Sequence, residues 1–278
     1  MNGSSRSIAI KKNIIASLFL KGISILVSLQ VVPLTINYIN PTRYGIWLTL
    51  SSIVAWLSYF DLGFAHGFRN RFAEAVAKGD MQLAREYVST TYVVLSLLFS
   101  SVFLIAIVVN HFVDWSAILN VDAAYSSELN IVFGILAFFF CLNIVASIFT
   151  TMLTANQKPA LASLIQTLGQ VFGFICIYIL TKTVPGNLDV LAFAFSGVPC
   201  FLLIISIGMF LSGRYRHLSP SFHFVHFSLT KKIVGLGGQF FIIMISMLFV
   251  FQLINIVISR VAGPMAVTQY NIAYKYFN

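Results

Sequence analysis

Ionisable side chains inside long apolar segments are the first candidates for chemistry in this sequence. Only 9% of the residues are charged, whereas 59% are hydrophobic. Three ionisable side chains nevertheless fall inside apolar runs, namely Lys21, Asp61 and Lys275. A charge at the centre of a membrane helix costs about 2.5 to 3.5 kcal/mol on insertion scales. Each of the three therefore requires a partner, water or a function, and the two cations suit an anionic ligand.

Lys21 and Asp61 have structural as well as functional explanations. On antiparallel helices, Lys21 would lie roughly 12 Å and Asp61 roughly 8 Å from the same membrane face. The two could form an ion pair, or Lys21 could extend its ammonium group to the membrane surface. Alternatively, Lys21 faces a substrate path and meets a pyrophosphate or an acidic sugar. The same alternatives hold for Lys275, whose neighbours Tyr274 and Tyr276 offer rings for stacking against sugars.

A charged segment, FRNRFAEAVAKGD, separates two of the apolar runs and contains Arg69 and Arg71. Guanidinium groups match phosphate geometry, so both arginines are candidates for capturing a lipid pyrophosphate at the mouth of a transport path. They could equally act only as topology determinants on a solvated connection. The pair Glu74 and Lys78, with Gly79 at a helix end, predicts a short amphipathic helix here.

Two further clusters are less suited to chemistry. His217, His223 and His226 share a loop that has no nearby acidic or cysteine ligand, so no metal site is predicted. Asp114 and Asp122 lie eight residues apart in apolar surroundings, which is typical of loop residues rather than of a catalytic pair. The sequence therefore predicts no catalytic residue, no metal, no cofactor and no enzymatic activity.

Transmembrane helices must position these residues. The mean hydropathy is +0.91 and the apolar runs are long enough to cross a bilayer. They are continuous rather than alternating, which favours an all-α membrane protein over a barrel. The predicted spans are 13–39, 44–65, 88–110, 129–153, 161–184, 190–212 and 233–259, with an eighth that starts at 267.

The distribution of basic residues predicts the orientation. If the N-terminus is cytoplasmic, 12 basic residues lie on that side and 3 on the other, so the positive-inside rule favours this orientation. The larger group comprises Arg6, Lys11, Lys12, Arg69, Arg71, Lys78, Arg85, Lys158, Arg214, Arg216, Lys231 and Lys232, and the smaller group Arg43, Lys182 and Arg260. Trp47, Trp56 and Trp115, near span ends, are predicted to anchor the helices at the membrane interfaces.

A pattern near the N-terminus returns late in the chain. A Lys-Lys pair precedes a long apolar run that ends in NPTRYGIW, and a second Lys-Lys pair precedes a run that ends in GPMAVTQYNIAY. Repeated halves with a substrate between them are common in transporters. We therefore expect residues 1–230 to form a six-helix lobe. Residues 231–278 would begin a second lobe with helix 7 and an incomplete helix 8, so that the chain is part of a two-lobe transporter.

Two stretches carry a family resemblance. The run YGIWLTLSSIVAWLSYFDLGFAHGFRNRFAEAVAKGDMQLAREYVSTTY and the closing YNIAYKYF resemble bacterial polysaccharide transporters. These are the O-antigen and capsule flippases of the multidrug/oligosaccharidyl-lipid/polysaccharide superfamily. The resemblance implies two six-helix lobes that move an undecaprenyl-pyrophosphate-linked oligosaccharide from the inner to the outer leaflet by alternating access. The substrate-binding candidates are Lys21, Asp61, Arg69, Arg71 and Lys275.

The same resemblance implies a place in lipopolysaccharide or capsule assembly at the bacterial inner membrane. Membrane lipids and the polysaccharide polymerase machinery would be partners, and nucleic acid would not. Two alternatives stay open. A cation-coupled drug or metabolite exporter would favour acidic residues within the spans, where only Asp61 occurs. A membrane component of polysaccharide assembly would be non-catalytic here, because an enzyme needs paired acidic or histidine ligands.

Overall fold

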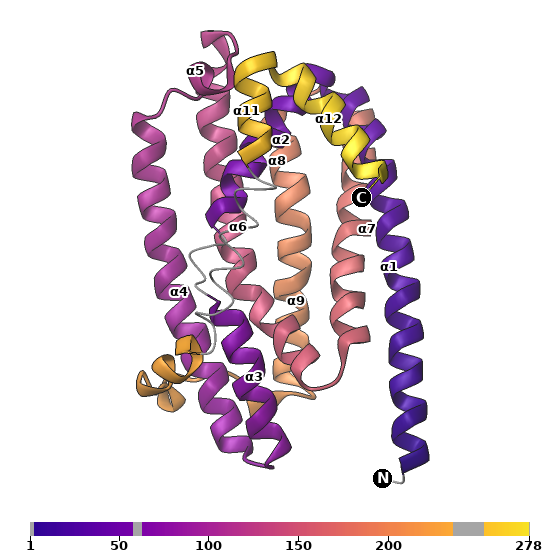
Figure 1. The fold of residues 1–278 in the computed structure, drawn as a ribbon, viewed down its shortest axis with the longest axis vertical. Coiled ribbons are helices and arrows are strands. Elements are labelled where there is room, and N and C mark those ends of the chain that lie inside the picture. Colours follow the sequence, from indigo (N-terminus) through magenta and orange to yellow (C-terminus); the bar gives the residue numbers. More distant parts are fainter. Residues whose placement is uncertain (1–2, 58–62, 236–252, 278) are drawn as a thin grey trace.

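The protein is a bundle of membrane-length helices. The computed structural model describes the backbone of residues 3–57, 63–235 and 253–277, and the side chains of 13–57, 63–235 and 253–275. Every element assigned within these ranges is a helix, and five are long and apolar enough to cross a membrane (Figure 1). Those five are Asn13–Ile39, Met81–Phe112, Ala123–Ala155, Pro159–Thr183 and Leu188–Ser212. The predicted all-α membrane fold is confirmed.

The elements follow one another with short connections. They are α1 (Gly3–Ile39), α2 (Pro41–Ala55), α3 (Phe64–Ala77), α4 (Met81–Phe112), α5 (Trp115–Leu119), η2 (Ala123–Tyr125), α6 (Ser126–Ala155), α7 (Pro159–Thr183), α8 (Leu188–Ala192), η3 (Phe193–Gly197), α9 (Val198–Ser212), η4 (Arg216–Leu218), η5 (Phe222–Phe224), α11 (Leu253–Ala262) and α12 (Pro264–Phe277). Residues 228–235 are also helical.

Five of the seven predicted spans are confirmed. The second, 44–65, corresponds to α2, which ends at Ala55, and to the beginning of α3 at Phe64; residues 58–62 between them lie outside the described part. The seventh, 233–259, includes residues 236–252, which also lie outside it. The lobe boundary at residue 230 stays a prediction.

Prolines and capping side chains explain where the helices begin. Pro41, Pro159 and Pro264 each stand in a first helical turn, where the missing N–H leaves no bond unmade. Asn40 and Asp80 cap α2 and α4 by accepting hydrogen bonds from the third residue beyond them, at 3.0 and 2.9 Å. Each helix start is therefore encoded locally.

Asp114 and Asp122 are helix caps as well. Asp114 accepts hydrogen bonds from the backbone N–H groups of Ser116 and Ala117 at the start of α5, and Asp122 from that of Ala124 at η2. Hydrogen bonds from Ser116 and Ala117 hold the pKa of the Asp114 carboxyl below its usual value. Both aspartates therefore serve as helix caps in the connection between α4 and α6.

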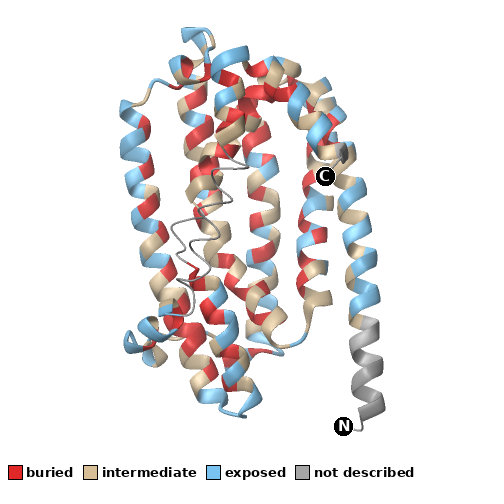
Figure 2. Ribbon diagram, viewed as in Figure 1, coloured by how far each residue is buried: buried red, intermediate tan, exposed pale blue. Residues whose placement is uncertain are grey.

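The apolar side chains form two buried clusters, one at each end of the bundle. One cluster joins α3 and most of α4 to the second half of α6, the start of α7 and the middle of α9. The other joins α2 and α5 to the first half of α6 and the end of α7. Figure 2 shows buried residues on the inward faces of the helices and exposed residues along the outer flanks of α1 and α4.

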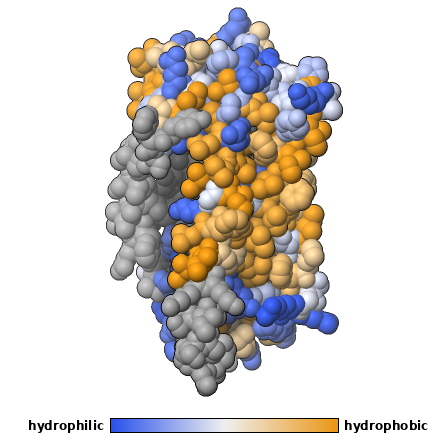
Figure 3. All heavy atoms as spheres, turned by 90° about the vertical axis from the view of Figure 1, so that its right-hand side faces the viewer, coloured by the Kyte–Doolittle hydropathy of each residue, from blue (hydrophilic) through white to orange (hydrophobic). Residues whose placement is uncertain are grey.

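The outer flanks are apolar where they would meet lipid. Phe19 on α1 is 70% exposed and Leu104 on α4 is 64% exposed. On the face that carries α1 and α7, a broad apolar band separates two hydrophilic ends (Figure 3). Such a band is what a membrane-spanning bundle presents to the hydrocarbon core.

Candidate functional site

A cavity of about 150 Å³ among α1, α7, η3, α9 and α12 contains one of the predicted cations. Lys275 reaches it from α12, roughly 16 Å along the helix from Pro264. The remaining lining residues are Val27, Ser28, Val31, Gln170, Gly173, Phe174, Ile177, Phe195 and Pro199. Lys275, a predicted site residue, thus lines this cavity.

One face of α12 carries Lys275 and the groups that hold this helix in place. The hydroxyl of Thr268 donates to the carbonyl oxygen of Pro41 at 2.7 Å. The amide of Asn271 donates to Asn255 on α11 at 2.8 Å. Residues three and four apart share a helix face, so Thr268, Asn271 and Lys275 point the same way. The hydrogen bonds of Thr268 and Asn271 therefore orient this face of α12, and with it Lys275, toward the bundle.

The Lys275 ammonium is half-buried without a compensating partner. It makes no hydrogen bond or ion pair with any residue whose side chain the structure describes. Nearby polar groups are engaged with each other, since Ser24 on α1 donates its hydroxyl to the side-chain oxygen of Gln170 on α7. A partly desolvated cation of this kind attracts an anion that enters the cavity.

A second cavity, of about 230 Å³, continues from the first and shares Phe195 and Pro199 with it. Its other lining residues are Trp47, Ser51, Val54, Leu136, Phe139, Phe140, Asn143 and Ser196. Together the two cavities combine an ammonium group, amides, hydroxyls and aromatic rings. This mixture suits a ligand that has both an anionic group and a sugar.

The backbone between the cavities departs from regular α-helix. A π-helical turn, η3, precedes Pro199, and such turns are frequent at functional sites. Gly169 lets α7 approach closely, because a β-carbon there would lie 3.2 Å from Pro199. By contrast, α1 continues as an α-helix through Pro33.

Two buried tryptophans correct one prediction. Trp47 is 4% exposed, with its ring edge-on to Phe195 at a centroid distance of 5.2 Å. Trp115 is 5% exposed and stacks on Phe133. The prediction that both anchor the protein at the membrane interface is therefore wrong, because their rings fill the interior of the bundle.

Lys21 is exposed, and the part of α1 that carries it packs against α7. The hydroxyl of Thr167 donates to the carbonyl oxygen of Leu20 at 3.4 Å, which marks the contact. Asp61 lies outside the described residues, so its ion pair with Lys21 stays a prediction.

Arg69 and Arg71 do not converge. Arg71 donates to Glu74 at 3.0 Å and to the carbonyl oxygen of Lys232 at 3.3 Å, which ties α3 to the helical residues 228–235. Arg69 is exposed and has no polar contact with the part of the chain that the structure describes. Residues two apart on a helix face different directions.

The predicted short amphipathic helix is confirmed as α3. The Lys78 ammonium donates to Glu74 at 2.8 Å, as the spacing indicates. Lys78 and Arg71 hold the pKa of Glu74 below its usual value. Gly79, with φ of 77°, follows the helix in the left-handed conformation that glycine allows.

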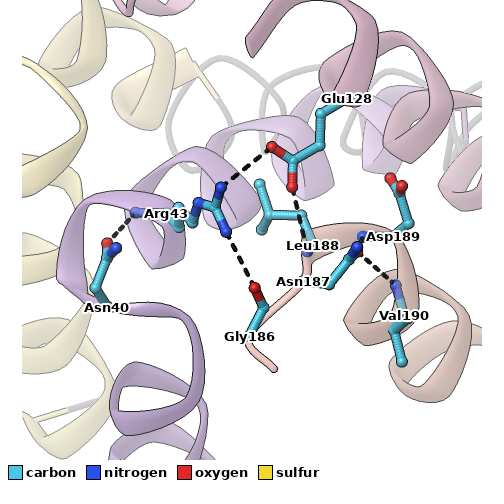
Figure 4. Close-up of polar contacts among 8 residues, drawn as sticks. All are labelled: Asn40, Arg43, Glu128, Gly186, Asn187, Leu188, Asp189 and Val190. Atoms are coloured by element: carbon cyan, nitrogen blue, oxygen red, sulfur yellow. Dashed lines mark hydrogen bonds and ion pairs between the residues drawn. The ribbon is translucent and has the colours of Figure 1, made fainter. Parts of the chain in front are cut away.

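A polar clasp at the opposite end was not predicted from the sequence. Arg43 lies 3.6 Å from Glu128 at the start of α6 and donates to the carbonyl oxygen of Gly186 at 3.1 Å (Figure 4). Glu128 also accepts a bond of 3.4 Å from the backbone N–H of Leu188. The clasp joins the first turns of α2 and α6 to the loop between α7 and α8, and no local signal links these segments.

The loop histidines form no cluster with other ligands. Within the described ranges, no group of three or more His, Cys, Asp and Glu side chains is placed to hold a metal ion. His226 instead lies 3.7 Å from Glu86 on α4.

Comparison with known protein families gives a match over nearly the whole chain. A family model described as polysaccharide biosynthesis protein matches residues 10–278. Searches of curated proteins and of solved structures each found no match.

Proposed function

We propose that this chain, which belongs to the polysaccharide biosynthesis protein family, is a flippase for a lipid-linked oligosaccharide. The family is the polysaccharide transporter branch of the multidrug/oligosaccharidyl-lipid/polysaccharide superfamily. The proposed substrate is an undecaprenyl-pyrophosphate-linked repeat unit of O-antigen or capsule. It would pass from the inner to the outer leaflet of the bacterial inner membrane by alternating access.

The observation that carries this proposal is the unpaired Lys275 ammonium in its cavity, where no described residue neutralises it. A lysine side chain offers a compact positive charge to phosphate, and the partly desolvated setting strengthens the attraction. The Gln170 amide nitrogen and the Ser28 hydroxyl can hydrogen-bond to sugar hydroxyls, while Phe174 and Phe195 offer apolar faces. These groups support a ligand that joins phosphate to sugar, and a purely apolar drug would not need them.

The size of the two cavities bears on the mechanism. Pockets that enclose a small molecule usually measure about 300 to 1,000 Å³. Cavities of about 150 and 230 Å³ fall below that range, so in this conformation they suit a pyrophosphate or one sugar rather than a repeat unit. Passage of the whole substrate therefore requires the helices around Lys275 to separate.

Contacts at one end of the bundle would have to break in that movement. Arg260 and Ser259 on α11 donate to the carbonyl oxygens of Ala117 and Leu119 in α5, at 2.9 and 3.0 Å. Together with the bond between Thr268 and Pro41, they close the end that the positive-inside rule assigns to the periplasm. We assign these bonds to the closed outer gate of the proposed cycle.

Export of surface polysaccharide by a flippase-deficient strain tests the function. Lys275→Ala should reduce export while membrane abundance is unchanged, and Lys275→Arg should retain more activity because it keeps the charge. The matched control is Lys182→Ala, which removes an exposed cation near the end of α7. Undiminished export by Lys275→Ala would refute the assigned role of this cavity, and export of a cationic drug instead of polysaccharide would favour the exporter alternative.

A further inference from the structure

A loop segment crosses α4 at the end of the bundle where α3 lies. Arg85 donates from Nε to the carbonyl oxygen of Ser219 at 2.9 Å. One helical turn further, Ser89 accepts a hydrogen bond of 3.1 Å from the backbone N–H of Ser221. These two bonds fix residues 219–221 across α4, with a different hollow on each side of the crossing.

The hollow on the Arg85 side is a basic groove of about 870 Å³. Its lining residues are Arg85, Leu211, Ser212, Arg216, His217 and Ser219, and none of them is acidic. Arg216 and His217 are exposed, so their charges are available to a ligand. Glu86, the acidic neighbour on α4, does not line the groove; it lies 3.7 Å from His226.

Arg85 is positioned before any ligand arrives. Its guanidinium carbon lies 4.2 Å from the centre of the Phe224 ring, and its Nε is bound to Ser219. Stacking on an aromatic ring fixes the plane of the guanidinium group. Its remaining N–H groups are thus held in place for a phosphate in the groove.

The hollow on the other side is an apolar cavity of about 410 Å³. It is lined by Ser89, Tyr92, Val93, Ser96, Leu97, Pro220, Ser221 and Phe222. Phe222 is 87% exposed and Leu97 is 60% exposed, so the cavity opens toward the lipid-facing surface. From Arg85 to Leu97 the distance along α4 is roughly 18 Å.

The spacing of the two hollows matches one kind of ligand. Half of the hydrocarbon core is about 15 Å thick, so a lipid whose phosphate lies at Arg85 has its acyl chain beside Leu97. A free anion would use only the groove, and a hydrocarbon would use only the cavity.

We propose that an anionic phospholipid binds across this crossing, with its phosphate in the basic groove and one acyl chain in the apolar cavity. The site shares no residue with the cavities around Lys275. The proposed lipid is thus assigned to a site separate from the Lys275 cavities, with a structural role. It holds the connection between α9 and the helical residues 228–235 against α4, at the predicted junction of the two lobes.

Native mass spectrometry of the purified full chain tests the proposal with two probes. These are dioleoylphosphatidylglycerol, which is anionic, and dioleoylphosphatidylcholine, which has no net charge. The wild-type protein should retain the anionic lipid preferentially. Arg85→Gln combined with Arg216→Gln should lower its occupancy roughly tenfold. Lys182→Gln removes an exposed cation at the opposite end of the bundle and should leave the occupancy unchanged.

Two further variants separate the phosphate from the acyl chain. Arg216→Gln alone alters an exposed side chain, so it weakens binding without a risk to folding. Val93→Trp fills the apolar cavity and should lower the affinity for the diacyl lipid but not that for inorganic phosphate. Wild-type lipid occupancy in the double arginine variant would overturn the proposal. So would full lipid binding by Val93→Trp, or displacement of the lipid by inorganic phosphate at equal concentration.

Discussion

The carbonyl oxygen of Pro264 occupies the space where a β-carbon on Gly45 would stand. The converse contact also exists, because Thr268 donates to the carbonyl oxygen of Pro41 at 2.7 Å. Gly45 is the fourth residue after Pro41, and Thr268 is the fourth residue after Pro264. Each of the two therefore contacts the carbonyl oxygen of the proline on the other helix. This reciprocity gives the repeated sequence pattern a structural counterpart in the crossing of α2 and α12.

Gly45→Ala should therefore destabilise the protein. The added methyl group meets backbone, which cannot rotate away, and overpacking of this kind costs about 1 to 3 kcal/mol. Thermal unfolding of the purified protein measures the effect. Gly22→Ala is the matched control, because a β-carbon there would have no neighbouring atom of the described residues within 4 Å. Equal stability of the two variants would show that α2 and α12 do not cross in this way.

Lys275→Met should raise the melting temperature. The wild-type side chain holds a half-buried charge without a partner among the described residues, and this costs free energy that methionine does not. The gain should accompany a loss of substrate binding. Lys78→Met is a suitable control, since Lys78 is exposed and paired with Glu74. A large loss of stability in Lys275→Met would instead identify a structural ion pair.

Arg69 and Arg71 should respond differently to substitution. Arg71→Gln removes the contacts with Glu74 and with the Lys232 carbonyl, so it should lower membrane abundance. Arg69→Gln breaks no contact within the described part, so any loss of polysaccharide export at normal abundance would come from substrate capture. Quantitative blotting of membranes alongside export separates the two effects. Unchanged export by Arg69→Gln would leave this arginine only its role in topology.

Much of the fold could be predicted because its signals are local. Continuous apolar runs locate the five spans, prolines mark helix starts, and the spacing of Glu74 and Lys78 predicts α3. The placement of Lys275 beside α1 and α7 could not be predicted. It depends on how α12 crosses α2, and that depends on the absence of a side chain at Gly45.

The clasp of Arg43, Glu128 and Gly186 was missed for a related reason. Arg43 and Glu128 stand in the first turns of α2 and α6 and Gly186 stands in the loop before α8, and only the packing of these segments brings them together. The interfacial position predicted for Trp47 and Trp115 was wrong for a different reason. Position near a span end indicates an interfacial ring, but the aromatic neighbours Phe195 and Phe133 draw Trp47 and Trp115 into the core.

Orientation can be tested directly with reporter fusions. The basic residues divide 12 to 3 between the two ends, so fusions after Lys78 and after His217 should report the cytoplasm. A fusion after Asp122 should report the periplasm. The reverse result at any of the three positions would contradict the predicted order of the spans.

The affinity of the purified protein for undecaprenyl pyrophosphate tests the central claim most directly. We predict that Lys275→Gln weakens this binding roughly tenfold or more, as expected for the loss of a charge-assisted contact. Lys275→Arg should retain most of the affinity, and Lys182→Gln should bind like the wild-type protein. Equal affinity of the wild-type and Lys275→Gln proteins would contradict the assignment of the Lys275 cavity as the pyrophosphate site.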